Sequence, residues 1–164
     1  MLTTFFDKLN KLIGNITAVL MLLVMINVFL DVLLRYFFHT GSIALQEMEW
    51  HIFAVMFLLG ISYALSDESH VRVDFIYDNL SKKRKAYINI FGTIFFLIPF
   101  ALFIAYGSFE FVMDAYSVNE ISEDPGGLTH RWIIKAMIPF SMILLVISAI
   151  GYIFNNIKIL KEEK

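Results

Sequence analysis

The sequence contains no cysteine, so disulfide bonds, thiolate metal ligands and cysteine nucleophiles play no part in its 164 residues. Charged side chains are also scarce, because Asp, Glu, Lys and Arg make up 17% of the chain, against about 25% in a typical soluble domain. In their place, 59% of the residues are hydrophobic, 17 are phenylalanine, and the mean hydropathy is +0.71. This composition predicts an integral membrane protein.

Long apolar runs predict four transmembrane helices joined by short connections. The runs lie at approximately residues 13–37, 47–66, 85–114 and 131–155. Each is long enough for a helix that crosses a bilayer, which needs roughly 20 residues. The expected fold is an all-α membrane protein in which residues 1–164 form a single membrane domain. The third run exceeds this length and contains Pro99, so we expect its helix to tilt, kink or project from the membrane.

Positive charge is distributed unevenly among the connections and sets the expected orientation. Of the 13 Lys and Arg residues, ten lie near the two termini or in residues 72–85, whereas Arg35, Arg131 and Lys135 lie at the other ends of the spans. Cytoplasmic connections are enriched in Lys and Arg. Both termini and residues 82–85 are therefore expected in the cytoplasm, and residues 120–127 in the periplasm.

The connections carry local structural signals. Apolar residues recur at helical spacing within residues 73–80, which predicts a short amphipathic helix on the membrane surface between the second and third spans. Ser42 is a possible cap for the second helix, and Ser81 is a favourable cap for the third. In the last connection, Pro125 before Gly126 and Gly127 predicts a type II turn, in which a glycine adopts the positive φ.

Ionisable residues within the first span lie on one helix face. Asn27, Asp31 and Arg35 are four residues apart, so Asp31 and Arg35 can form an ion pair on a face that avoids lipid. Asp31 has two interpretations, a coupling-ion or proton site and a structural ion pair that orients the helix end. We favour the structural pair, because Asp31 is expected near the outer end of its span.

The second span begins with a polar stripe. Glu47 and His51 are four residues apart, as are Gln46 and Trp50, so one helix face combines polar groups with an amphipathic tryptophan. Glu and His are metal ligands, but a catalytic metal site needs a third ligand that this stretch does not supply. We interpret the stripe as a boundary surface that packs against a partner.

Carboxylates gather after the third span. The acidic residues of this region are Glu110, Asp114, Glu120, Glu123 and Asp124. With few cations nearby, they predict an acidic outer rim. The rim is either a docking surface, where complementary charge accelerates association, or ordinary solvated surface.

Short motifs follow one another along nearly the whole chain. They are Asp31-Val-Leu-Leu-Arg35-Tyr36, Gln46-Glu47, residues 57–65 (FLLGISYAL), residues 70–74 (HVRVD), residues 124–128 (DPGGL), Arg131-Trp132 and residues 135–139 (KAMIP). Their order and spacing resemble the small, DctQ-like membrane subunit of TRAP transporters, the tripartite ATP-independent periplasmic transporters. The resemblance implies subunit-interface or family-motif roles for Asp31, Arg35, Glu47, Trp50, Gly60, His70, Arg72, Asp74, Arg131, Trp132 and Lys135.

The resemblance also implies a function and partners. In this family a large membrane subunit holds the substrate and sodium ions, and a soluble periplasmic protein delivers the substrate, usually a carboxylate. The small subunit braces the large one in the cytoplasmic membrane of bacteria or archaea. The chain is therefore expected to be a non-catalytic scaffold that lacks a cofactor and metal of its own, contacts membrane lipid, and helps to dock the binding protein. No role with nucleic acid is implied.

Two other classes of function remain as alternatives, a membrane haem or quinone enzyme and a self-sufficient exporter or channel. A membrane haem or quinone enzyme needs histidines in facing spans, but His39, His70 and His130 fall in connections or at span ends, and only His51 lies within a span. A self-sufficient exporter or channel needs a deep ionisable site or a polar pore, for which Asp31 is the sole and shallow candidate.

Overall fold

The computed structural model describes residues 2–66, 77 and 80–162, and all of its regular elements are helices. They are α1 (Leu2–Phe37), α2 (Ile43–Ser66), α4 (Lys82–Gly92), the π-helix η1 (Thr93–Leu97), α5 (Ile98–Ser117) and α6 (Trp132–Glu162). Four stretches are long and apolar enough to cross a membrane: Phe5–Phe37, Ile43–Ser66, Lys82–Ser117 and Trp132–Glu162. The predicted all-α membrane fold with four spans is confirmed.

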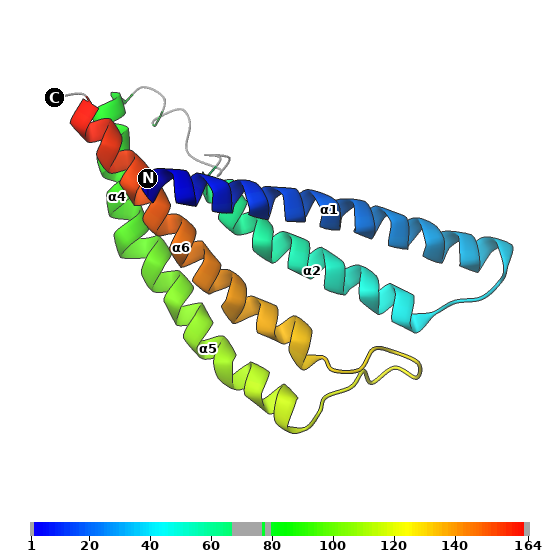
Figure 1. The fold of residues 1–164 in the computed structure, drawn as a ribbon. Coiled ribbons are helices and arrows are strands. Elements are labelled where there is room, and N and C mark those ends of the chain that lie inside the picture. The colour runs from blue at the N-terminus through cyan, green and yellow to red at the C-terminus, as the bar shows by residue number, and fades with distance from the viewer. Residues whose placement is uncertain (1, 67–76, 78–79, 163–164) are drawn as a thin grey trace.

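The helices form two antiparallel hairpins that diverge from a common end (Figure 1). α1 packs along α2, α2 packs on α6, and α6 packs on α4 and α5, so α2 and α6 lie between the other two spans. The start of α1 also contacts α6. We call the end that carries the chain termini the terminal end, and the end that carries residues 38–42 and 118–131 the loop end. Buried residues that connect α2, α5 and α6 are Leu65, Ala101, Met142, Leu145, Ala149 and Tyr152.

The third span contains a π-helical turn immediately before Pro99. Proline has no backbone N–H, and its ring clashes with the carbonyl four residues earlier, here that of Phe95. The chain accommodates this with the wider turn of η1, in which the Ile98 N–H donates to the Thr93 carbonyl, five residues back. The helix thus continues through Pro99 by widening locally.

Close helix contacts depend on glycine at two places. A Cβ atom on Gly151 of α6 would lie 2.6 Å from Cγ of Phe6, and one on Gly14 of α1 would lie 2.5 Å from Cε2 of Tyr63. These distances are too short for a side chain. Packing at the terminal end therefore requires small residues, as is usual between transmembrane helices.

The predicted helix caps and the predicted turn in the connections are found in the described residues. The Ser81 hydroxyl accepts from the Arg84 N–H at 3.5 Å, and the Ser42 hydroxyl accepts from the Leu45 N–H at 3.4 Å, so both serines cap their helices. Gly126 has a φ of 87°, and the Gly127 N–H donates to the Asp124 carbonyl at 3.0 Å, as the turn prediction required. The predicted interfacial helix lies outside the described residues, apart from Tyr77 and Leu80.

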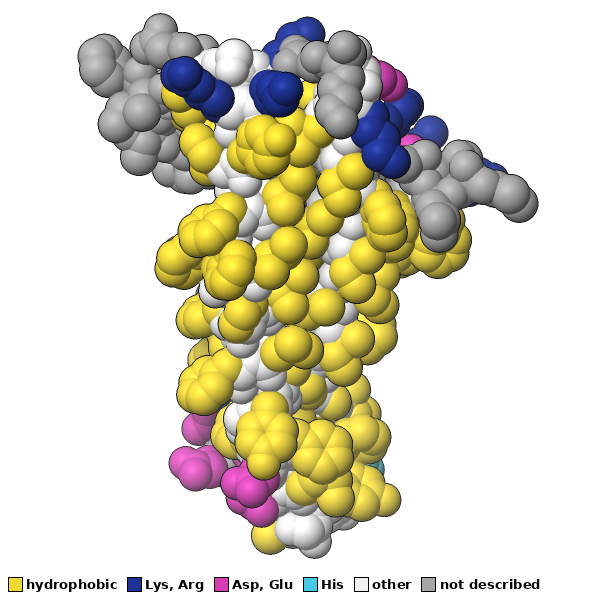
Figure 2. Space-filling view, turned by 90° about the vertical axis from the view of Figure 1, so that its left-hand side faces the viewer, with side chains coloured by type: hydrophobic (Ala, Val, Ile, Leu, Met, Phe, Trp, Pro, Cys, Tyr) yellow, Lys and Arg dark blue, Asp and Glu magenta, His cyan; other side chains and the backbone are white. Residues whose placement is uncertain are grey.

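Charge is separated along the molecule. Figure 2 shows most of the Lys and Arg side chains of this face at the terminal end, together with a few acidic ones, a group of Asp and Glu side chains at the loop end, and a broad hydrophobic surface between them. A hydrophobic band between two charged ends is what a membrane-spanning protein presents to lipid.

Candidate functional site

Glu47 connects the two helical hairpins at the loop end. Its carboxylate accepts a hydrogen bond from the Ser122 hydroxyl and, at 2.5 Å, another from the Leu128 N–H. Glu47 lies at the start of α2, whereas Ser122 and Leu128 belong to the loop between α5 and α6. We call Glu47, Ser122 and Leu128 the clasp. Gly127 is part of its geometry, because a Cβ there would lie 2.5 Å from the Ser122 Cβ and 2.8 Å from the Glu47 carboxylate.

The clasp loop is held in shape by its own backbone. Asn119 has a φ of 50°, the Glu120 N–H donates to the Ala115 carbonyl at 2.9 Å, and the Asn119 N–H donates to the Tyr116 carbonyl at 3.1 Å. These bonds form a Schellman motif that ends α5. The Ser122 N–H then donates to the Leu128 carbonyl at 3.0 Å, so the two loop residues of the clasp are also joined to each other.

Glu120 joins the same loop to α6, which corrects the predicted acidic rim. Its carboxylate forms an ion pair with Lys135 and lies 3.8 Å from Nε of Arg131. Lys135 also lies over the ring of Phe111, 4.0 Å from its centroid. The prediction of five carboxylates with few nearby cations was therefore wrong for Glu120. It failed because the Schellman turn brings Glu120 back against the first turns of α6.

The other four rim residues keep the exposure that the rim prediction requires. Glu110, Asp114, Glu123 and Asp124 are exposed, and the described residues provide no ion pair for them. The carboxylates at the loop end are visible in Figure 2. Whether they bind a partner stays a prediction.

Asp31 and Arg35 form the predicted ion pair, with different exposure for the two partners. The Asp31 side chain is 7% exposed, the Arg35 side chain is 52% exposed, and only one Asp31 carboxylate oxygen has a partner among the described residues. One turn earlier, the Asn27 side chain donates to the Leu45 carbonyl of α2 at 2.9 Å. The face of α1 that carries Asn27 and Asp31 therefore faces protein, as its polarity predicted.

The remaining motif residues are dispersed over the structure. Trp132 packs edge to face on Tyr116, with ring centroids 5.3 Å apart. A Cβ built on Gly60 would lie 3.7 Å from the Thr17 methyl group of α1, whereas Trp50 is 67% exposed. The other three motif residues lie outside the described residues: His70, Arg72 and Asp74.

Two partly buried polar contacts at the terminal end were not anticipated from the sequence. The Ser148 hydroxyl of α6 donates to the Asn10 side chain of α1 at 3.1 Å. Asn89 of α4 donates to Asn156 of α6 at 3.0 Å, and Asn156 in turn donates to the Tyr152 carbonyl at 2.9 Å. The available signal was the presence of asparagines in long apolar helices, where an amide needs a partner in another helix.

The three histidines that the structure describes lie in two different places. His51 and His130 line one pocket of about 370 Å³ beside the clasp loop, and His39 lies in the first connection. The described residues contain no group of three His, Asp or Glu side chains that could hold a metal ion.

The spans bury little of their surface within the chain. In the most apolar window of each span, the buried share is 11%, 17%, 11% and 28% in chain order. α1 and α5 expose many large apolar side chains, including Phe29 at 61%, Phe103 at 77% and Tyr106 at 83%. This chain therefore presents wide apolar faces to lipid or to other membrane helices.

Comparison with known proteins places this architecture in a family. The family model described as "Tripartite ATP-independent periplasmic transporters, DctQ component" matches residues 24–158. Two Haemophilus influenzae proteins named as TRAP transporter small permease proteins are similar to the chain. One is 29% identical over 150 residues, covering 90% of this chain and 93% of that protein. The other is 30% identical over 151 residues, covering 89% of this chain and 84% of that protein.

A third relative is much longer. The sialic acid TRAP transporter permease protein SiaT of Haemophilus influenzae is 25% identical over 142 residues, which cover 87% of this chain but 22% of SiaT. These relatives and the four membrane-crossing helices identify a multi-pass protein of the bacterial inner membrane. Because the family model covers residues 24–158, the chain belongs to the DctQ component family of the tripartite ATP-independent periplasmic transporters.

Proposed function

We propose that this chain is the small, non-catalytic scaffold subunit of a sodium-coupled tripartite importer of carboxylates or other organic acids. It braces a large membrane subunit, which holds the substrate and the sodium ions. A periplasmic substrate-binding protein delivers the substrate, and the exposed carboxylates Glu110, Asp114, Glu123 and Asp124 help to dock it. The chain uses no cofactor of its own.

The low burial of the spans is the observation that carries this proposal. At most 28% of any span's most apolar window is buried, so most of the helix surface remains for contacts outside the chain. Several polar groups between the helices are hydrogen-bonded to one another, as in the Asn10–Ser148 and Asn89–Asn156 pairs. This arrangement fits a brace better than a self-sufficient transporter, which needs a polar site enclosed by its own helices.

SiaT gives independent support for a large partner. Residues similar to this chain make up only 22% of SiaT, so in that relative they are joined to a much longer remainder. We infer that a corresponding large membrane subunit accompanies this chain as its partner.

The proposal is tested by purification from the native membrane followed by transport assays. The affinity-tagged chain is expected to retain a large multi-spanning TRAP subunit. In proteoliposomes, uptake is expected only when the large subunit and the binding protein are both present. Uptake by this chain alone would refute the scaffold role and favour the exporter or channel alternative.

The proposed orientation places the terminal end in the cytoplasm and the loop end in the periplasm. Because the chain has no cysteine, single cysteines can report this orientation. Ile121, which is 60% exposed, serves at the loop end, and exposed Lys161 serves at the terminal end. In intact cells whose outer membrane is permeable to the reagent, an impermeant maleimide should label Ile121→Cys and not Lys161→Cys. The opposite pattern would reverse the orientation.

A further inference from the structure

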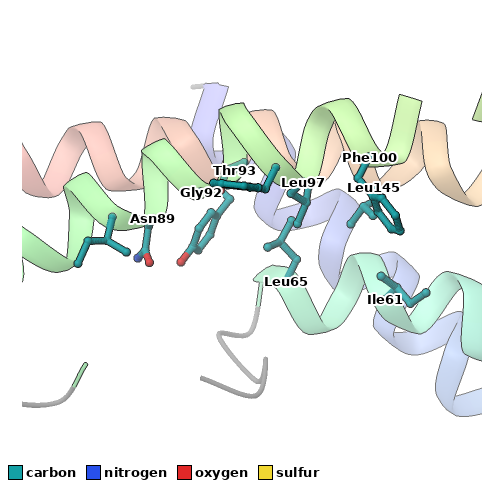
Figure 3. A pocket seen from close by; sticks show the side chains of 11 residues that line it. Ile61, Leu65, Asn89, Gly92, Thr93, Leu97, Phe100 and Leu145 are labelled. Carbon is teal, nitrogen blue, oxygen red and sulfur yellow. The ribbon is translucent and has the colours of Figure 1, made fainter. Parts of the chain in front are cut away.

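An apolar groove at the terminal end lies outside the function proposed above. It runs between α2, the α4–η1–α5 helix and α6, and its volume is about 570 Å³, within the range of about 300–1,000 Å³ that is usual for ligand sites. Figure 3 shows side chains from all three sides converging on it. Its apolar wall includes Ile61, Leu65, Leu97, Phe100 and Leu145.

Gly92 and the π-helical turn border the open space of this groove. Gly92 lines the groove, and a Cβ built on it would meet no atom within 4 Å. η1 begins at the next residue, Thr93, whose side chain is buried. A side chain introduced at position 92 would therefore start in open space at the groove, which gives a direct way to fill it.

Apart from Thr93, the polar residues that line the groove lie toward the start of α4. Asn89 and Tyr152 line it there, and the Asn89 side chain accepts a hydrogen bond from the Tyr77 hydroxyl at 3.0 Å. The ammonium group of Lys85 lies 4.9 Å from the centroid of the Tyr77 ring. One end of an otherwise apolar groove thus has hydrogen-bonding groups and a cation.

Lys82 is a second cation on the face of α4 that carries Lys85 and Asn89. Lys82, Lys85, Asn89 and Gly92 are separated by three, four and three residues, so they share one face of α4. Lys83 and Arg84 fall on other faces of the same helix. The residues of α4 include no acid, so its first turn has strong net positive charge.

We propose that this groove binds an anionic phospholipid. The acyl chains lie along the apolar wall formed by α2, α5 and α6, and the phosphate lies at Lys82 and Lys85. An amphiphile with one anionic end matches a groove that is apolar along its length and cationic at one end. Basic pockets between transmembrane helices bind anionic lipid headgroups in this way.

The headgroup part of the proposal is tested by charge removal at matched positions. The purified chain is exchanged into detergent with phosphatidylglycerol or phosphatidylcholine, and bound lipid is counted by native mass spectrometry. We expect retention of phosphatidylglycerol over phosphatidylcholine. Lys82→Gln/Lys85→Gln should lose most of the bound phosphatidylglycerol, whereas Lys83→Gln/Arg84→Gln, with the same net charge, should keep it. If both double variants lost the same amount of bound phosphatidylglycerol, binding would depend only on the overall positive charge of α4, and the proposal would be overturned.

The acyl-chain part is tested by filling the groove. Gly92→Leu should lower lipid occupancy, while Gly107→Leu, at another helical glycine with open space around it, should leave occupancy unchanged. Circular dichroism and gel filtration establish that both variants fold. Undiminished binding to folded Gly92→Leu would overturn the groove as the site. So would cross-linking of a partner helix, rather than lipid, to a photoreactive residue at position 92.

Discussion

Replacing Glu47 by alanine is expected to release the loop of residues 118–131 from α2 and to lower the thermal stability of the purified chain. The substitution removes the acceptor for both the Ser122 hydroxyl and the Leu128 N–H. In the folded loop, the Leu128 N–H would then have no hydrogen-bond acceptor. An unpaired backbone N–H destabilises the folded state. The effect should be measured as a lower unfolding temperature and as faster proteolysis within the loop.

Glu49 provides the matched control for this experiment. It lies on the same turn of α2 and is half-buried, but no hydrogen bond connects it to another described residue. Glu49→Ala should therefore leave loop proteolysis close to that of the unmodified chain. Glu47→Gln should fall between the two, because an amide retains one acceptor oxygen. Equal behaviour of Glu47→Ala and Glu49→Ala would show that the clasp does not hold the hairpins together.

Replacing Gly151 by alanine is expected to lower the free energy of unfolding by about 1–3 kcal/mol, the usual result of overpacking a close contact. The new Cβ would lie 2.6 Å from Cγ and 2.8 Å from Cβ of Phe6. The Phe6 Cβ cannot swing aside with its ring, so α1 and α6 must separate. Unfolding by denaturant in mixed micelles measures this change.

Gly107 is the control, because a Cβ there would meet no atom within 4 Å. Gly107→Ala should be neutral, or stabilising by up to about 1 kcal/mol, through the better helix propensity of alanine. Phe6→Ala removes the ring but keeps the Cβ, so in combination with Gly151→Ala it should cost less than the sum of the two single losses, because the two residues are in contact and their effects are not additive. If Gly151→Ala is as stable as Gly107→Ala, the contact between α1 and α6 is looser than the structure describes.

Several features of the fold were predictable because they depend on nearby residues or on composition. Four long apolar runs predicted the four spans, since a helix is the only way for a single run to satisfy its backbone in lipid. Ser81 as a cap and positive φ at Gly126 followed from local backbone chemistry. Asp31 and Arg35 pair because they are four residues apart on one helix.

Contacts between distant residues were decided by the tertiary structure alone. Helical periodicity shows which side chains share a face, but not which other helix or loop meets that face. The polar stripe at Glu47 predicted a partner, and only the fold shows that part of this partner is Ser122, 75 residues away. Glu120 was predicted to be part of an open rim, yet the turn after α5 returns it to Lys135.

The family could be predicted from the sequence, whereas the polar contacts between helices could not. The order of short motifs along the sequence sufficed to indicate the DctQ family, which the family model over residues 24–158 confirmed. Asn10 and Ser148, separated by 138 residues, gave no comparable signal. Their pairing depends on the close approach of α1 to α6, which the absence of a side chain at Gly151 permits. The sequence by itself thus determined the spans, caps and family, whereas the packing of one helix on another decided which polar groups meet.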